Sequence, residues 1–338
     1  MARAGVTLSH RDRIAWTFAS GLVSALEGRL LPQRATLELL NAGGLDDLLA
    51  RVRQTAMFAD LGDHRGPFEL AEEMQACAAA AFRRLGDASP TRSVAGIFLL
   101  PIEWQAFRGF LRAKALGLER GNAPGSAVTD AVWEQCWATA DVAPPFDLFA
   151  ASAAALRDSG PREELEPQVA DAITSLYEAR DIRRAAHATG SPVIAGWVDT
   201  LLKLRLALAL LRCRVNEWGN VLGADAFDDL GLSRTDVQAL LAPERRDWRA
   251  PFVSLGFAAI LTIPEEEALP AAAIERLTDD AITDPSRGGR GLAFGPEPVF
   301  AYLWALRIEA LNLKTLVAGV AAGLSREAIS KDIRQTYV

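Results

Sequence analysis

Apolar residues recur along this chain at intervals of three and four, a spacing that places them on one face of an α-helix. Near the start, the run from Arg13 reads as one helix that stops near Pro32, and the next run closes on the glycine pair 43–44. A third helical run, LDDLLARVRQTAMF, follows at once. The alternation typical of strands is nearly absent, so the sequence predicts an all-α fold built from helices with short links.

Clusters of glycine, proline and serine divide this helical pattern into larger segments. The most pronounced cluster, DPSRGGRGLAFGPEP at 284–298, predicts a long loop. A helix should start near Pro298, because proline suits the first turn, where the missing N–H costs nothing. It can run as far as Gly323, a residue type that commonly ends helices.

Two segments of the chain, 101–117 and 308–323, resemble each other. Glu103 aligns with Glu309, Arg108 with Lys314, and Gly117 with Gly323. The segment 198–214 is a looser third copy, which predicts a threefold helical array, with three similar helical domains and a pseudo-threefold internal repeat. The expected domains are approximately residues 1–122, 123–224 and 225–338, either consecutive along the chain or interleaved.

Glu103 and Glu309 fall within the apolar arc of their predicted helices. Glu103 follows Pro101 in an expected first turn, where the helix dipole favours an anion. Glu309 lies too deep in its helix for that explanation, so it needs either a structural ion pair or a partner at an interface. The candidate residues for an interface or an internal ion pair are Glu309, Asn312, Lys314, Glu103, Arg108, Arg112, Arg205 and Arg212. In the loop expected at 284–295, Arg287 and Arg290 are candidates for ordering against a partner.

Charge and composition narrow the functional classes. With 36 basic and 43 acidic residues, the net charge of −7 argues against nucleic acid as the main partner. No apolar stretch approaches the roughly 20 residues that cross a bilayer, and the N-terminus lacks the apolar core of a secretory signal. The sequence therefore predicts a cytoplasmic location without direct membrane insertion.

The chain also lacks the usual patterns of enzyme sites. No phosphate-binding GxxxxGK[ST] motif occurs, and GGRGLAFG at 288–295 has no lysine. The three histidines, His10, His64 and His187, are scattered, and no acidic pair is part of an Asp-Asp-x-x-Asp motif. We therefore predict no catalytic residue, no cofactor and no metal site.

The C-terminal segment carries a recognisable signature. It resembles the C-subunit family of V/A-type rotary ATPases, which includes the d subunit (AC39) of vacuolar enzymes. The matching positions are Gly295, Glu297 and Pro298, then Glu309, Asn312, Leu313 and Lys314, then Gly323 and Leu324, and finally Tyr337 and Val338. The segment 18–61 is similar to the opening helices of that family.

This resemblance implies a mechanical role. Members form a funnel of three similar helical domains that sits on the proteolipid ring and receives the tip of the central shaft. The chain would then be a non-catalytic central-stalk subunit, with the shaft subunits and the proteolipid ring as partners, held at the membrane through the ATPase membrane sector. The alternative is a free-standing helical scaffold or adaptor derived from that family.

Overall fold

The computed structural model describes residues 9–62, 66–117, 123–158, 167–213, 224–241, 249–264 and 271–338. These residues form helices, turns and loops and contain no strand, which confirms the all-α prediction. The chain divides into two compact units. Unit 1 comprises residues 1–99, 185–197 and 275–338, and unit 2 comprises 100–184 and 198–274. The division into three similar domains stays a prediction.

Unit 1 contains both ends of the chain. Its helices are α1 (His10–Ile14), α2 (Thr17–Glu27), α3 (Gln33–Glu38), η1 (Leu39–Asn41), α4 (Leu45–Val52), α5 (Pro67–Asp87), η7 (Arg287–Gly291), α14 (Pro296–Ala321) and α15 (Arg326–Lys331). Four further helices contribute residues to both units: α6 (Ser93–Leu116), α9 (Pro167–Ala188), α10 (Pro192–Cys213) and α13 (Ala271–Ser286).

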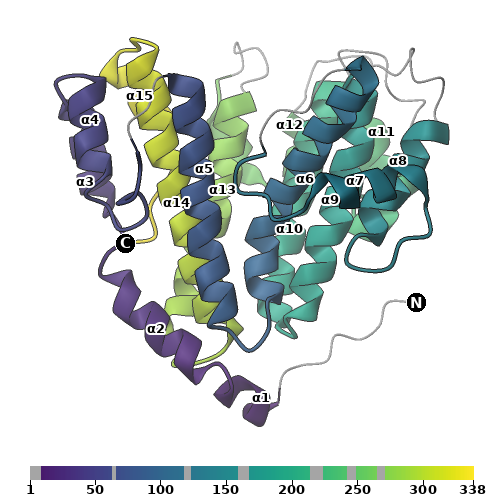
Figure 1. Ribbon diagram of the computed structural model, residues 1–338, viewed down its shortest axis with the longest axis horizontal. Coiled ribbons are helices and arrows are strands. Elements are labelled where there is room, and N and C mark those ends of the chain that lie inside the picture. Colours follow the sequence, from purple (N-terminus) through teal and green to yellow (C-terminus); the bar gives the residue numbers. More distant parts are fainter. Residues whose placement is uncertain are drawn as a thin grey trace. The chain divides into compact units, whose positions relative to one another are not determined.

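Helix α14 is the central element of unit 1. It packs on α2, α4, α5, η7 and α15, and Figure 1 shows it side by side with α5. Its 26 residues end as the sequence predicts: Gly323 has a left-handed φ of 69°, and the N–H of Leu324 bonds back to the carbonyl of Gly319 at 2.9 Å. That pattern is the Schellman motif, which pairs the last free carbonyls of a helix.

The long loop expected at 284–298 is reduced to residues 292–295, and the rest of that segment is helical. Helix α13 continues through Pro285 to Ser286, and the 3₁₀ helix η7 follows directly. The glycines there serve close packing: a Cβ on Gly289 would lie 2.9 Å from the carbonyl oxygen of Glu297. The high glycine content of this segment predicts a flexible loop. Gly289 instead allows η7 to lie close to α14, because it has no side chain at the point of contact.

The N-terminal helices are shorter than expected. The predicted helix from Arg13 to Pro32 is interrupted after Ile14 and resumes at Thr17. Trp16 lies in the interruption and is almost completely buried. Burial of this large side chain outweighs continuation of the helix, because an indole contributes more apolar contact than one extra helical turn.

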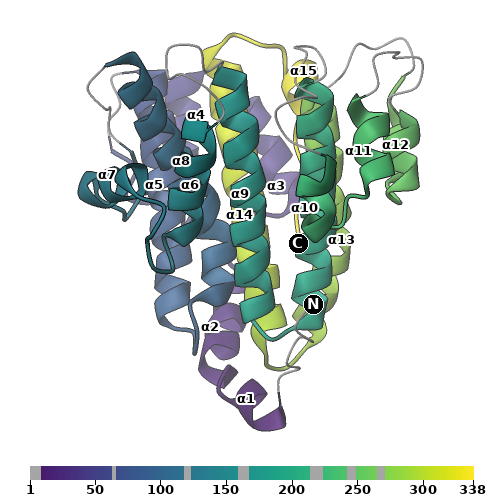
Figure 2. The ribbon, with the colours of Figure 1, turned by 90° about the vertical axis from the view of Figure 1, so that its right-hand side faces the viewer.

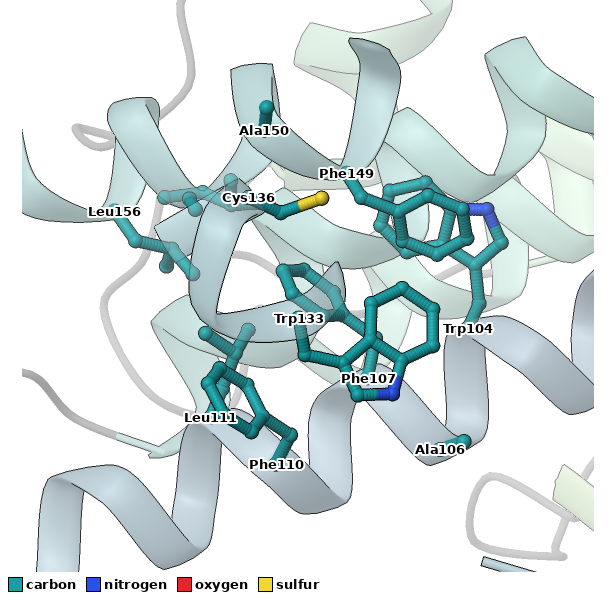
Figure 3. Packing of buried hydrophobic residues seen from close by; sticks show 12 residues of the cluster. Trp104, Ala106, Phe107, Phe110, Leu111, Trp133, Cys136, Phe149, Ala150 and Leu156 are labelled. Carbon is teal, nitrogen blue, oxygen red and sulfur yellow. The ribbon is translucent and has the colours of Figure 1, made fainter. Parts of the chain in front are cut away.

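Unit 2 is built around an aromatic cluster. Its own helices are α7 (Asp130–Ala138), α8 (Asp147–Asp158), η5 (Ala224–Leu230), α11 (Arg234–Leu241), α12 (Arg249–Ser254) and η6 (Ala258–Thr262), and α11 lies beside α12 (Figure 2). Figure 3 shows Trp104 stacked on Phe149, with ring centroids 4.1 Å apart. Phe107 and Trp133 complete the cluster, at 5.2 Å from each other. All four side chains are buried, so they form the core of this unit.

One helix among the described residues is long and apolar enough to cross a membrane. It is the stretch Ser93–Lys114 of α6, and half of it is buried inside the protein. The apolar stretch read from the sequence, 94–102, is much shorter than this helix. The core helix of a water-soluble protein meets the same criterion, so a single such helix is weak support for a membrane span.

The buried position of Leu313 on α14 generates a stability prediction. This side chain is completely buried, so Leu313→Asp places a carboxylate in the core and should cost at least about 3 kcal/mol. Thermal melting followed by circular dichroism should show loss of the unit 1 transition. Leu292→Asp, at a position that is 45% exposed, is the control and should melt close to wild type. Equal melting of both variants would contradict the core assignment.

Candidate functional site

The Gly-x-Glu-Pro signature forms a clamp at the start of α14. The carboxylate of Glu297 is completely buried and accepts two hydrogen bonds from Arg13, at 3.2 and 3.0 Å. The hydroxyl of Ser191 donates a third, at 2.7 Å. Two oxygens on a forked guanidinium make a strong, directional pair. The clamp therefore fixes α1 and the segment before α10 to the first turn of α14.

Gly295 makes this clamp possible. Its φ of 138° lies in the region that favours glycine, and a Cβ there would lie 2.5 Å from Oε2 of Glu297 and 3.0 Å from the Arg13 guanidinium. The hydroxyl of Ser20 also accepts a hydrogen bond from the N–H of Gly295, at 3.3 Å. Any other residue at this position would displace the carboxylate from its partner.

Asn312 holds the C-terminal tail, residues 332–338. Its side-chain amide is buried and bonds both main-chain groups of Arg334: Nδ2 donates to the carbonyl at 3.0 Å, and Oδ1 accepts from the N–H at 2.8 Å. An asparagine amide offers one donor and one acceptor side by side, which matches a peptide group. The side chain thus takes the place of a neighbouring backbone segment.

The rest of the tail is bound through polar contacts within unit 1. Asp279 accepts from both Arg334 and Arg307, at 2.7 and 2.9 Å. The hydroxyl of Tyr337 donates to Glu27 at 2.8 Å. Further bonds join Gln335 to Asp280, and Thr336 to Gln33 and Arg287. The closing Tyr-Val of the signature is therefore an internal anchor.

Arg287 and Arg290, the candidates for ordering against a partner, contact this tail. Arg287 donates to the carbonyl of Thr336 at 2.6 Å. Arg290 pairs with Glu27 at 3.2 Å and lies over the ring of Tyr337. Both cations are thus satisfied within unit 1.

Glu309 is buried against a main-chain donor. Its side chain accepts the N–H of Leu31 at 2.8 Å, and among the described residues no cation forms an ion pair with it. Burial raises the pKa of this carboxyl to about 7, with the Leu31 hydrogen bond lowering the pKa in part. Its partner is therefore the connection between α2 and α3 rather than a basic side chain.

Lys314 lies one and a half turns further along α14. Its side chain is half-buried, and burial lowers the pKa of its amine. Among the described residues it forms neither an ion pair nor a side-chain hydrogen bond. The structure does not bring Lys314 together with Glu309.

Glu103 in unit 2 has the same kind of partner as Glu309. It accepts the N–H of Ala127 at 2.9 Å and the hydroxyl of Ser126. The first-turn explanation for Glu103 was wrong, because α6 starts at Ser93 and runs through Pro101. Each of the two aligned carboxylates instead fixes a connection that leads into a helix, α7 here and α3 in unit 1.

The arginines of α6 attach it to α9. Arg108 donates to Thr174 and Ser175 and pairs with Glu178, and Arg112 pairs with Asp171 at 2.8 Å. Arg205 is half-buried on α10. Arg212 lies on the same helix, but its side chain falls outside the described residues.

The sequence did not predict the groups that form hydrogen bonds with the buried polar side chains of α14. Arg13, Ser20 and Ser191 lie far from Glu297 in the sequence, and Leu31 contributes only its main-chain N–H, which no residue type signals. One signal was available: a buried glutamate in a Gly-x-Glu-Pro segment requires a basic partner. Among the described residues, no three His, Cys, Asp or Glu side chains are grouped so as to hold a metal ion.

Comparison with known proteins assigns the chain to a family. The model of the family described as ATP synthase (C/AC39) subunit matches residues 19–332. The chain belongs to this family. The match includes the glycine, glutamate and asparagine that hold α14 in place.

A curated relative supports the assignment. The C subunit of the V-type sodium ATPase of Enterococcus hirae is 33% identical to this chain over 72 residues. Those residues span 21% of this chain and 22% of that relative. The shared segment is short, and the family match extends the likeness over nearly the whole chain.

Gly295→Ala tests the clamp. The new Cβ would displace Glu297 and hold the backbone in a disfavoured conformation, so we expect a loss of about 1–3 kcal/mol in the free energy of unfolding. Urea titration measures it. Gly21→Ala is the matched control, since no atom lies within 4 Å of the added methyl on the exposed side of α2, and it should stabilise by about 0.5–1 kcal/mol. A neutral Gly295→Ala variant would show that the clamp tolerates a side chain.

Glu309→Gln tests the buried carboxyl. The folded protein keeps this proton up to about pH 7, whereas the unfolded chain releases it near 4.5, so ionisation destabilises the wild type as the pH rises between these values. Glutamine still accepts the Leu31 N–H and carries no charge. Relative to wild type, the variant should gain about 3 kcal/mol between pH 4.5 and pH 8. Urea titrations at both pH values measure this, and a pH-independent difference would contradict it.

Proposed function

We propose that this chain is a non-catalytic central-stalk subunit of a V/A-type rotary ATPase, in which it acts as the socket between the rotating shaft and the membrane proteolipid ring. The family match over residues 19–332 carries this proposal. The curated relative, named as the C subunit of a V-type sodium ATPase, supports it. The complex would use this socket in ATP-driven transport of protons or sodium ions, or in ATP synthesis.

The build of unit 1 suits a part that transmits torque. A socket must pass on rotation without deforming, and close-packed interiors transmit strain. Helix α14 is buried along most of its length, and its buried polar side chains are bonded to distant segments of the chain. Interactions of this kind resist sliding of one helix along another, because each bond would have to break.

We further infer that the internal resemblance reflects repeated domains. Glu103 and Glu309 hold equivalent hydrogen bonds to a connecting segment, and Gly117 and Gly323 both adopt left-handed φ, at 66° and 69°. These parallels support a duplicated helix with a shared stop. They are consistent with the three-domain arrangement expected from the sequence. On the family match we also propose a cytoplasmic position, with attachment to the membrane through the proteolipid ring.

A pull-down tests the proposed function. The tagged full-length chain is recovered from gently solubilised native membranes, washed with high detergent and examined by mass spectrometry. We expect the catalytic ATPase subunits and the proteolipid to remain bound, because both lie on the proposed path of torque. A parallel sample of the same chain without the tag controls for adhesion to the resin. Recovery of the wild-type chain alone from the soluble fraction would contradict the proposal and favour a free-standing scaffold.

A further inference from the structure

Unit 1 contains a pocket beside the connection between α2 and α3. Its volume is about 580 Å³. The lining comes from the connection after α2, from α3 and η1, and from the end of α4: Arg29, Leu31, Ala35, Glu38, Leu39, Arg51, Gln54, Thr55 and Ala56. Pockets of this size accommodate one or two side chains or a small organic molecule. Several of the lining residues are exposed, so the pocket is open to solvent.

The charges around the pocket are balanced except at Arg29. Arg51 pairs with Asp47 at 2.8 Å, and Glu38 pairs with Arg34 at 2.8 Å. Arg29 is exposed, and among the described residues it has neither an ion pair nor a side-chain hydrogen bond. Among the described residues, the guanidinium of Arg29 is therefore the positive charge at this pocket that has no carboxylate paired with it.

Other arginines of unit 1 differ from Arg29 because they form ion pairs within the unit. Arg13, Arg290 and Arg334, for example, are each used in the internal network. Arg29 follows directly on the end of α2 but contributes no bond to that network. A long cationic side chain kept at a pocket without an internal partner is available to an anion from outside.

The apolar part of the lining favours an apolar group next to the bound anion. Leu31, Leu39 and Ala35 contribute apolar side chains to the lining, to which Arg29 also belongs. Leu31 is fixed in place, because its N–H bonds to the buried Glu309. An apolar lining is suited to packing against an apolar group, and the cation of Arg29 is suited to a carboxylate.

We propose that this pocket receives an acidic side chain with an apolar neighbour from another subunit of the rotary complex, with Arg29 as the residue that pairs with the incoming carboxylate. This inference rests on the proposed function. A protruding side chain fits an open pocket better than a free small molecule does, because the partner's remaining surface supplies the rest of the burial. Arg51 also lines the pocket and adds a second, partly compensated positive charge.

Two substitutions test the pairing. Arg29→Glu reverses the charge and should weaken retention of the full-length chain in the complex by at least about tenfold. Because Arg29 has no ion-pair partner among the described residues, the isolated variant should melt within about 2 °C of wild type. Arg92→Glu, at an exposed arginine of unit 1 that lies outside the pocket and pairs with Asp87 at 2.7 Å, is the control for charge reversal and should be retained like wild type. Equal retention of Arg29→Glu and wild type would overturn the proposal.

Cross-linking identifies the partner. In the Arg29→Lys variant, assembled in place of the native chain, a carbodiimide joins the introduced amine directly to a carboxylate that pairs with it. We expect a product with an aspartate or glutamate of another subunit, and none from Arg92→Lys. Products confined to this chain, in an assembled complex, would overturn the inference while leaving the proposed function intact. Failure of the wild-type chain to assemble would overturn both.

A free anion is distinguished by a third measurement on the isolated chain. Millimolar inorganic phosphate should change the melting temperatures of wild type and Arg29→Gln by the same amount, because a lone arginine at an open pocket binds a small anion weakly. Selective stabilisation of wild type by phosphate would overturn the assignment to a protein side chain and would indicate a small-anion site.

Discussion

The structure of unit 1 depends on the burial of polar side chains along one helix. Helix α14 is apolar enough to occupy the centre of the unit, yet it carries Glu297, Glu309 and Asn312 on its buried side. A buried charge or amide without a partner costs several kcal/mol. Each of these groups is therefore satisfied by a distant segment: α1, the α2–α3 connection and the C-terminal tail, respectively.

This constraint links the two ends of the chain to the same helix. Arg13 reaches the first turn of α14, and residues 334–337 are bonded beside its middle and to neighbouring helices. Such polar contacts select one register among many that apolar packing alone would allow. A subunit that transmits rotation needs this property, since a helix that slips by one turn would lose the torque.

The sequence predicts where the helices lie along the chain, but not which residues their buried polar side chains contact. Periodic apolar positions and the stop at Gly323 identify α14 to within two residues of its ends, because both depend on local chemistry. The expected loop at 284–298 failed for a physical reason: glycine signals either flexibility or close packing, and only the neighbouring α14 decides which. The partner of Glu309 was unpredictable, since a main-chain N–H is the same in every residue. Family resemblance identified the important positions without showing their contacts.

We propose that the chain lies between the shaft and the proteolipid ring. Electron cryo-microscopy of the complex purified through the tagged full-length chain tests this position. We expect density for this chain at the junction, in contact with the shaft on one side and the ring on the other. Density for the chain elsewhere in the complex, or particles that contain the chain without an ATPase, would contradict it.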